Sequence, residues 1–176
     1  MNRVIRKSRA QSSSEVLDML GALFSAELVA PSKSIWLVSP WISDVEVVDN
    51  SANTYSSLAR FGRRPVRLVE ILVTLAEQGT AVVIGTTPDK HNDMFLRRLQ
   101  ALEQDLRVER GIEVVVDTTG KLHTKALTGD DYAVVGSMNI TYTGINLREE
   151  HVELRTDEAY VEQARMDAFE RFGGVL

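Results

Sequence analysis

The sequence predicts an α/β fold in which a mixed β-sheet is flanked by helices on both faces. Three short apolar runs, residues 34–38, 80–85 and 112–116, are rich in valine and isoleucine, which is typical of strands buried on both sides. Amphipathic stretches of helical period separate these runs, and a β-hairpin pattern follows them. The alternation of strand and helix favours parallel strands, and the later hairpin adds antiparallel ones.

The chain opens with a basic segment, residues 1–10, followed by an amphipathic helix. We interpret the basic segment as a solvated, frayed terminus; the alternative is an arm that contacts a nucleic acid backbone. The serine run 12–14 can cap the helix, whose apolar residues recur at helical spacing until Pro31 ends it. This apolar stripe is expected to join the core.

The first predicted strand ends in a polar turn that contains Trp41. Open α/β sheets bind ligands at the carboxyl ends of their strands. Trp41 is therefore a candidate to bind substrate by stacking on a base or a ribose, and the alternative is half-buried packing.

Residues 43–64 lack a clear period, which predicts a long polar loop. This loop ends in arginines, and Arg60, Arg63, Arg64 and the nearby Arg67 form the densest basic patch in the sequence. Such a patch can bind a phosphate backbone. The alternatives are a solvated face and a contact surface between subunits.

The remaining elements continue the alternation. Pro65 suits the first turn of a helix that Gly79 stops. His91 has no lysine two residues later and is interpreted as a surface or capping histidine. The further predicted elements are a helix over 89–110, hairpin strands over 121–127 and 132–135, an irregular segment or short helix over 139–148, a last strand over 151–155 and a closing helix over 158–172.

The composition is that of a globular protein, and 176 residues suit a single domain over 1–176. The net charge of −5 argues against a nucleic-acid binder that relies on overall charge, yet it allows a local basic groove. Without cysteine the chain has no disulfides and no thiolate zinc sites, and no apolar run is long enough for a transmembrane helix. We expect a cytoplasmic protein that needs no metal, no other cofactor and no membrane.

The segment 121–150 concentrates residues suited to attack on a phosphate. His123 and Lys125 stand two residues apart, so in an extended segment they point to the same side. A phosphodiester needs a nucleophile, positive charge around its oxygens and an acid for the leaving oxygen. The residues that offer these groups, or orient them, are His123, Lys125, Ser137, Asn139 and Glu150.

This stretch resembles the HKD signature of the phospholipase D superfamily, in which His-x-Lys is followed by an aspartate and then by Gly-Ser-x-Asn. The matching residues are His123, Lys125, Asp130, Gly136, Ser137 and Asn139. The spacer between Asp130 and Gly136 is one residue shorter than in the usual pattern, so Asp131 is an alternative to Asp130 as the motif aspartate. Glu150 stands where the family carries an acidic residue at the start of its last strand.

The resemblance implies an α-β-α sandwich and a metal-independent phosphodiesterase in which two HKD motifs meet. One histidine, here His123, forms a phosphohistidine, and the histidine of the other motif protonates the leaving group and then activates water. Glu150 resembles the acidic partner that orients this histidine, whereas Asp130 is interpreted as tying the hairpin. The chain contains a single His-x-Lys, so the resemblance implies a homodimer that shares its active site.

The predicted function is DNA cleavage by a small homodimeric nuclease, which resembles the nucleases that serve with partner proteins in bacterial restriction or defence. Two other functions stay open. One is hydrolysis or transfer of a phospholipid head group, and the other is a catalytically silent module that binds nucleic acid. The sequence specifies neither DNA over RNA nor a strand preference.

Overall fold

The computed structural model describes residues 2–7, 14–108, 111–146 and 149–176. The described strands are β1 (Arg3–Lys7), β2 (Ser34–Val38), β3 (Glu46–Asp49), β4 (Pro65–Arg67), β5 (Ala81–Thr86), β6 (Ile112–Val116), β7 (Ala126–Thr128), β8 (Ala133–Gly136) and β9 (Glu150–Arg155). The described helices are α1 (Ser14–Val29), α2 (Leu68–Glu77), α3 (Asp93–Leu106), α4 (Tyr142–Asn146) and α5 (Glu158–Phe172), with short 3-10 helices η1 (Ser56–Phe61) and η2 (Lys90–Asn92).

Seven of these strands form one sheet in the order β1-β9-β8-β7-β2-β5-β6, and β3 pairs with β4 in a separate ribbon. Strands β2, β5 and β6 run parallel to one another. The other neighbours in the large sheet are antiparallel. The predicted mixed sheet is therefore confirmed, with its parallel part built from the three apolar runs.

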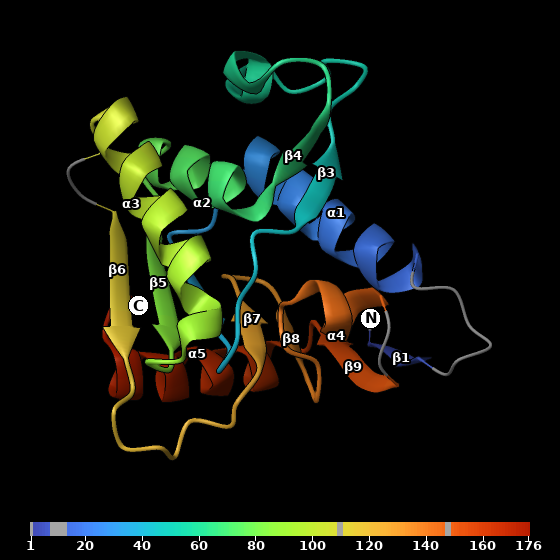
Figure 1. Cartoon of the computed structure of the whole chain (residues 1–176). Coiled ribbons are helices and arrows are strands. Elements are labelled where there is room, and N and C mark those ends of the chain that lie inside the picture. Colours follow the sequence, from blue (N-terminus) through green and yellow to red (C-terminus); the bar gives the residue numbers. More distant parts are fainter. Residues whose placement is uncertain (1, 8–13, 109–110, 147–148) are drawn as a thin grey trace.

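Helices cover both faces of the sheet, as the alternating side chains of β2 show. Ile35 and Leu37 belong to the main core with apolar residues of α1, α2 and α3, whereas Trp36 and Val38 pack with Phe172 of α5 on the other face. In Figure 1, α2 and α3 lie in front of the strands and α5 lies behind them. This arrangement confirms the predicted α/β fold class.

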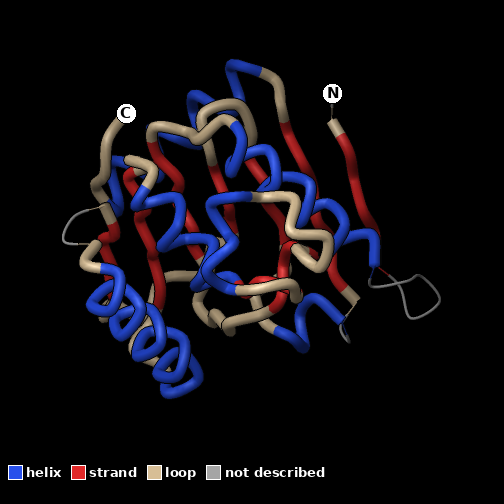
Figure 2. Tube along the Cα trace, turned by 90° about the horizontal axis from the view of Figure 1, so that it is seen from above, coloured by secondary structure: helices blue, strands red, loops and turns tan. Residues whose placement is uncertain are grey.

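The N-terminal segment differs from its predicted frayed state. Residues Arg3–Lys7 form β1, which pairs antiparallel with β9. Figure 2 shows this strand at the outer edge of the sheet, beside β9. Ile5 is 4% exposed and joins the main core, so one apolar side chain fixes a strand whose arginines face outward. The predicted caps Ser12 and Ser13 lie outside the described residues.

The polar loop predicted over 43–64 also contains regular structure. β3 and β4 form an antiparallel ribbon, and η1 lies between them. Val47, Val48 and Val66 bury their side chains in the main core, which explains why this segment is ordered. Pro65 begins β4 rather than a helix, and α2 starts at Leu68.

Two element boundaries depart from the prediction. Strand β7 begins only at Ala126, so His123 and Lys125 lie in an irregular segment just before it. Helix α3 ends at Leu106 because Arg107 takes a left-handed conformation with φ of 55°. The predicted helix end at residue 110 lies outside the described residues.

Candidate active site

The strand registers bring four distant segments to one edge of the sheet. Val38, at the end of β2, pairs with Ala126, and Ala126 pairs with Val135. Gly136 in turn pairs with Val152 near the start of β9. The loops that follow β2 and β8, and those that precede β7 and β9, therefore meet at this edge. It is the carboxyl edge of the parallel strands, where open α/β sheets bind ligands.

His123 and Lys125 contact each other directly at this edge. The ammonium Nζ of Lys125 lies 3.2 Å from Nδ1 of His123 and donates to the carbonyl oxygen of His123 over 2.6 Å. His123 is exposed, whereas Lys125 is 9% exposed. Burial lowers the pKa of Lys125, and the carboxylate of Glu150 opposes this shift.

The lysine contact also sets the tautomer of His123. A charged lysine can only donate, so Nδ1 of the imidazole accepts. A neutral His123 in this arrangement carries its proton on Nε2. In this tautomer Nε2 donates a hydrogen bond, and a nucleophilic Nε2 requires Lys125 to leave Nδ1 so that Nδ1 can carry the ring proton.

Ser137 and Glu150 form a second pair at the same edge. The hydroxyl of Ser137 donates to Oε2 of Glu150 and accepts from the backbone N–H of His151 over 3.0 Å. Gly136 lets the backbone of β9 approach β8 closely here. Its φ is 156°, and an added Cβ would overlap the carbonyl oxygen of His151. Glu150 therefore holds Ser137 in this structure, rather than His123 as the resemblance implies.

Asn139 is held from the neighbouring strand end. Its Oδ1 lies 3.2 Å from the hydroxyl of Ser39, the residue that follows β2. Asn139 is 9% exposed, like Lys125. Because Oδ1 faces Ser39, the amide Nδ2 is the group of Asn139 that is left to donate to a phosphoryl oxygen.

Two residues that position the site were not found from the sequence. Asn92 is fully buried, accepts from the N–H of Ile42 at 2.8 Å and donates to the carbonyl of Pro40 at 2.9 Å, so it fixes the loop after β2. Asp117 accepts from the N–H of Leu122 at 2.7 Å and so holds the loop that leads to His123. Single polar residues without a motif give no sequence signal for such roles.

Asp130 does not reach this site, although it matches the motif. It lies in the turn between β7 and β8, at the opposite edge of the sheet from His123. Its Oδ2 accepts from the N–H of Lys33 at 2.8 Å, and its Oδ1 lies 3.1 Å from Arg165. Asp130 therefore ties the hairpin turn to β2 and α5, and we withdraw it from the candidate catalytic residues.

The predicted basic patch is also remote from the site. Figure 1 shows η1 and the β3–β4 ribbon at the top of the molecule, and the loop between β6 and β7 at the bottom. Arg60 forms a bidentate pair with Glu77, and Arg64 forms one with Glu70. Arg63 lies in the same segment. Arg60 and Arg64 therefore brace the fold, and all three arginines lie far from the site, so the structure does not support them as substrate ligands.

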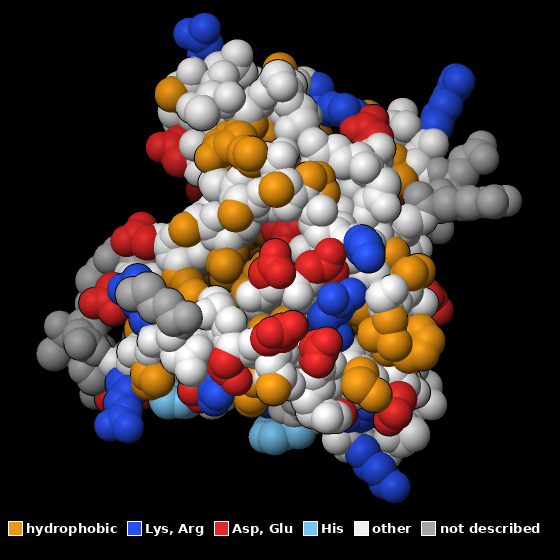
Figure 3. Space-filling model, turned by 180° about the vertical axis from the view of Figure 1, so that it is seen from behind, with side chains coloured by type: hydrophobic (Ala, Val, Ile, Leu, Met, Phe, Trp, Pro, Cys, Tyr) orange, Lys and Arg blue, Asp and Glu red, His pale blue; other side chains and the backbone are white. Residues whose placement is uncertain are grey.

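The face covered by α5 carries acidic and basic side chains side by side (Figure 3). Arg165 contacts Asp130, and Arg171 lies 3.7 Å from Asp117. Such a mixed surface gives an anionic backbone no continuous positive field. The pale-blue histidine side chains in the same view lie along its lower edge.

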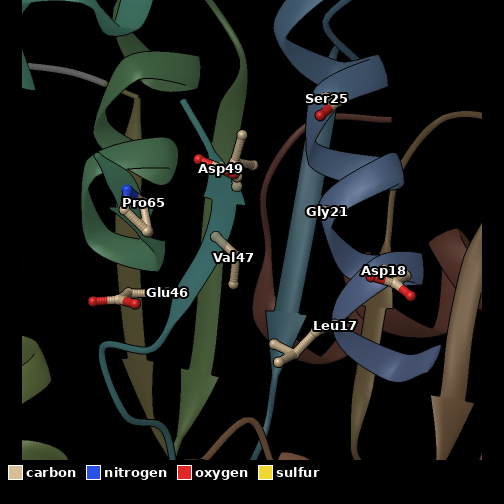
Figure 4. Close-up of a pocket in the computed structure, with 9 residues that line it drawn as sticks. Leu17, Asp18, Gly21, Ser25, Glu46, Val47, Asp49 and Pro65 are labelled. Atoms are coloured by element: carbon tan, nitrogen blue, oxygen red, sulfur yellow. The ribbon is translucent and has the colours of Figure 1, made fainter. Parts of the chain in front are cut away.

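A surface pocket of about 370 Å³ lies between α1 and β3 (Figure 4), away from this edge. Asp18 of α1 and Glu46 and Asp49 of β3 line it. Three carboxylates repel an anionic substrate, so this pocket does not suit a phosphodiester.

The fold and this edge define the class of protein: the chain belongs to the phospholipase D superfamily. A family model described as "Cardiolipin synthase, PLD-like domain" matches residues 25–172. No curated protein matches the chain in sequence.

Solved structures share the fold at low sequence identity. NucT from Helicobacter pylori has a TM-score of 0.60 at 15% identity, with 99% of each chain covered. Nuc from Salmonella typhimurium, a phospholipase D family member, has a TM-score of 0.56 at 15% identity, again with 99% of each chain covered. TrmBL2, an archaeal chromatin protein with a novel mode of DNA binding, has a TM-score of 0.52 at 13% identity over 99% of this chain and 54% of that one.

Superfamily membership supports a phosphodiesterase or phosphoryl-transfer enzyme in general terms. None of the described helices combines the length and the apolarity that crossing a bilayer requires.

Proposed function

We propose that this protein is a metal-independent phosphodiesterase that cleaves DNA through a phosphohistidine on His123. The observation that carries the proposal is the meeting of His123, Lys125 and Asn139 at one edge of the sheet. A nucleophile, a buried cation and an amide donor are the groups that attack on a phosphoryl group requires, and all three lie at this edge.

The reaction divides between two histidines. Nε2 of one His123 forms a bond to phosphorus while the bond from phosphorus to the leaving oxygen breaks, and a second imidazolium gives that oxygen its proton. The second imidazole then removes a proton from water, and the water oxygen replaces Nε2 on phosphorus. Before the attack, Lys125 moves from Nδ1 of His123 to the phosphoryl oxygens, where its charge stabilises the transition state, and the ring proton shifts through solvent from Nε2 to the freed Nδ1.

The second histidine comes from another copy of the chain. The sequence has one His-x-Lys, and His91 and His151 lack a lysine two residues on. A twofold axis at the site edge supplies the second motif through an isologous contact. In restriction or defence, which we propose as the setting, partner proteins would supply targeting.

DNA is favoured over a lipid as substrate. The fold it shares with a DNA-binding chromatin protein supports this choice. The family model named for cardiolipin synthase keeps a phospholipid as the second candidate. A lipid substrate would show itself as head-group release from liposomes.

The test is cleavage of plasmid and of oligonucleotides in EDTA, together with the mass of the protein in solution. We expect a dimer that cuts DNA in EDTA, and a loss of at least about 1,000-fold in His123→Ala. His151→Ala is the matched control, because only the backbone of His151 bonds to Ser137. A folded dimer that cuts neither DNA nor RNA would contradict the proposal.

A further inference from the structure

An exposed tryptophan stands beside the candidate site in a fixed orientation. Trp41 is 38% exposed, and its indole Nε1 donates to Oδ2 of Asp89 over 3.2 Å. The other tryptophan, Trp36, is fully buried between the sheet and α5. Trp41 is therefore not needed to fill the core, yet its ring is held in place.

A histidine extends this aromatic surface. The ring of His91 lies 6.4 Å from that of Trp41, centroid to centroid, at an interplanar angle of 46°. Nε2 of His91 lies 2.9 Å from the hydroxyl of Ser43, and its backbone N–H donates to Oδ1 of Asp89 over 2.8 Å. Asp89 thus holds the indole of Trp41 and the backbone of His91, and Ser43 contacts the ring of His91. We call Trp41, Asp89 and His91 the aromatic platform.

The platform is joined rigidly to the site. The hydroxyl of Ser39 lies 2.8 Å from the carbonyl of Trp41 and 3.2 Å from Oδ1 of Asn139. The N–H of Ser43 donates to the carbonyl of Ile140 over 2.8 Å, next to Asn139. The side chain of Asn92 bonds to the backbone of the same loop, at Pro40 and Ile42. A ring ordered in advance loses little freedom when it binds a ligand.

We propose that the aromatic platform stacks an unpaired nucleobase next to the scissile phosphodiester, so that single-stranded DNA is the preferred substrate. This inference rests on the proposed function and specifies its substrate. Every base offers a flat face to an indole, and the contact is worth the same for most sequences. Within a duplex both faces of a base are covered by its neighbours, so an exposed ring binds only an unpaired one.

Substitution of Asp89 tests the proposal, because its two possible roles predict opposite changes in DNA binding. A carboxylate near a DNA-binding surface repels the backbone, so its removal strengthens binding if it has no other role. If Asp89 orients Trp41, Asp89→Ala weakens binding instead. Asp89→Asn keeps an oxygen for the indole and loses the charge, so it binds at least as tightly as the parent.

The experiment measures binding to protein carrying His123→Asn, which prevents turnover. The ligands are a short single-stranded oligonucleotide, the same strand with abasic sites, and the corresponding duplex. We expect quenching of Trp41 fluorescence by the intact strand only, and binding about 5- to 150-fold weaker in Trp41→Ala but largely kept in Trp41→Phe. Phe169→Ala is the control, since Phe169 is also 38% exposed but lies on α5.

Equal binding of the intact and abasic strands, or tighter binding by Asp89→Ala, would overturn the platform. Preference for the duplex would overturn it as well. Cleavage by the wild-type protein is measured separately on the same strands. If the wild type cuts none of them while the binding results hold, the nuclease proposal fails and the platform remains.

Discussion

At the scale of single residues, Lys125 shows how burial adjusts a catalytic charge. The side chain is almost fully covered, which lowers the pKa of its ammonium, and the negative charge of Glu150 limits that shift. The group therefore loses its proton at a lower pH than an exposed lysine does. Its contact with His123 links this charge to the tautomer of the ring.

This shift predicts a pH dependence. The cationic form is the one that binds the phosphate, so activity falls as the pH rises through the lowered pKa of Lys125. In Lys125→Arg the guanidinium stays charged, and the alkaline decline disappears even if the rate is reduced. Lys125→Met lowers kcat about 100- to 1,000-fold at all pH values. Profiles of kcat/KM for a chromogenic phosphodiester check this, and matching alkaline limbs in wild type and Lys125→Arg would refute it.

Residues of one type also differ sharply in role here. Gly136 is required because a backbone carbonyl occupies the space of its missing Cβ, whereas Gly120, also at positive φ, has nothing within 4 Å of that position. The Gly-Ser step of the motif is thus explained by packing of β8 against β9. The pattern in the sequence identified Gly136 but not this cause.

At the scale of elements, the β3–β4 ribbon shows why charge alone misleads. Its neighbouring arginines looked like a phosphate-binding patch, but Arg60 and Arg64 are paired with Glu77 and Glu70 of α2. Glu70 is nearly buried, with Arg64 at 2.6 Å and Arg98 at 3.7 Å. Burial raises the pKa of Glu70, and the bonds from Arg64 and the backbone of Arg67 outweigh it, so the pKa lies below its usual value.

These contacts predict separate effects on stability and binding. Arg64→Ala leaves the buried Glu70 without its main partner and lowers the free energy of unfolding by about 1–3 kcal/mol. Arg60→Ala breaks a half-exposed pair and costs about 0–1 kcal/mol. Both variants keep the wild-type KM for oligonucleotides. Urea unfolding and steady-state cleavage measure the two quantities; a raised KM with unchanged stability would restore these arginines as substrate ligands.

At the scale of the whole molecule, the sequence predicts the apolar parallel strands of the sheet better than it predicts β1 and the β3–β4 ribbon. The apolar runs of β2, β5 and β6 specify buried strands, because local pattern and burial agree there. Strand β1 has one inward apolar side chain, and β3 and β4 are very short, so their pairing depends on distant partners. Local patterns do not carry that information.

The candidate site divides in the same way. His123, Lys125, Ser137, Asn139 and Glu150 were predicted from one contiguous motif, and the strand registers bring them to one edge. Asn92 and Asp89 bond to a loop about 50 residues away, and Asp117 bonds within its own loop, so no motif marks any of them. Asp130 matched the motif by spacing alone, and the hairpin carries it to the opposite edge.

The central claim, that His123 attacks phosphorus, is tested most directly by trapping the intermediate. The protein is mixed with a single-stranded oligonucleotide in EDTA, quenched during turnover at alkaline pH to preserve phosphoramidates, and digested for mass spectrometry. The account predicts a nucleotidyl or phosphoryl adduct on His123. In Ser137→Ala, too, it predicts no adduct on any residue other than His123. Sustained cleavage with no adduct on His123, or with an adduct on another residue, would contradict it.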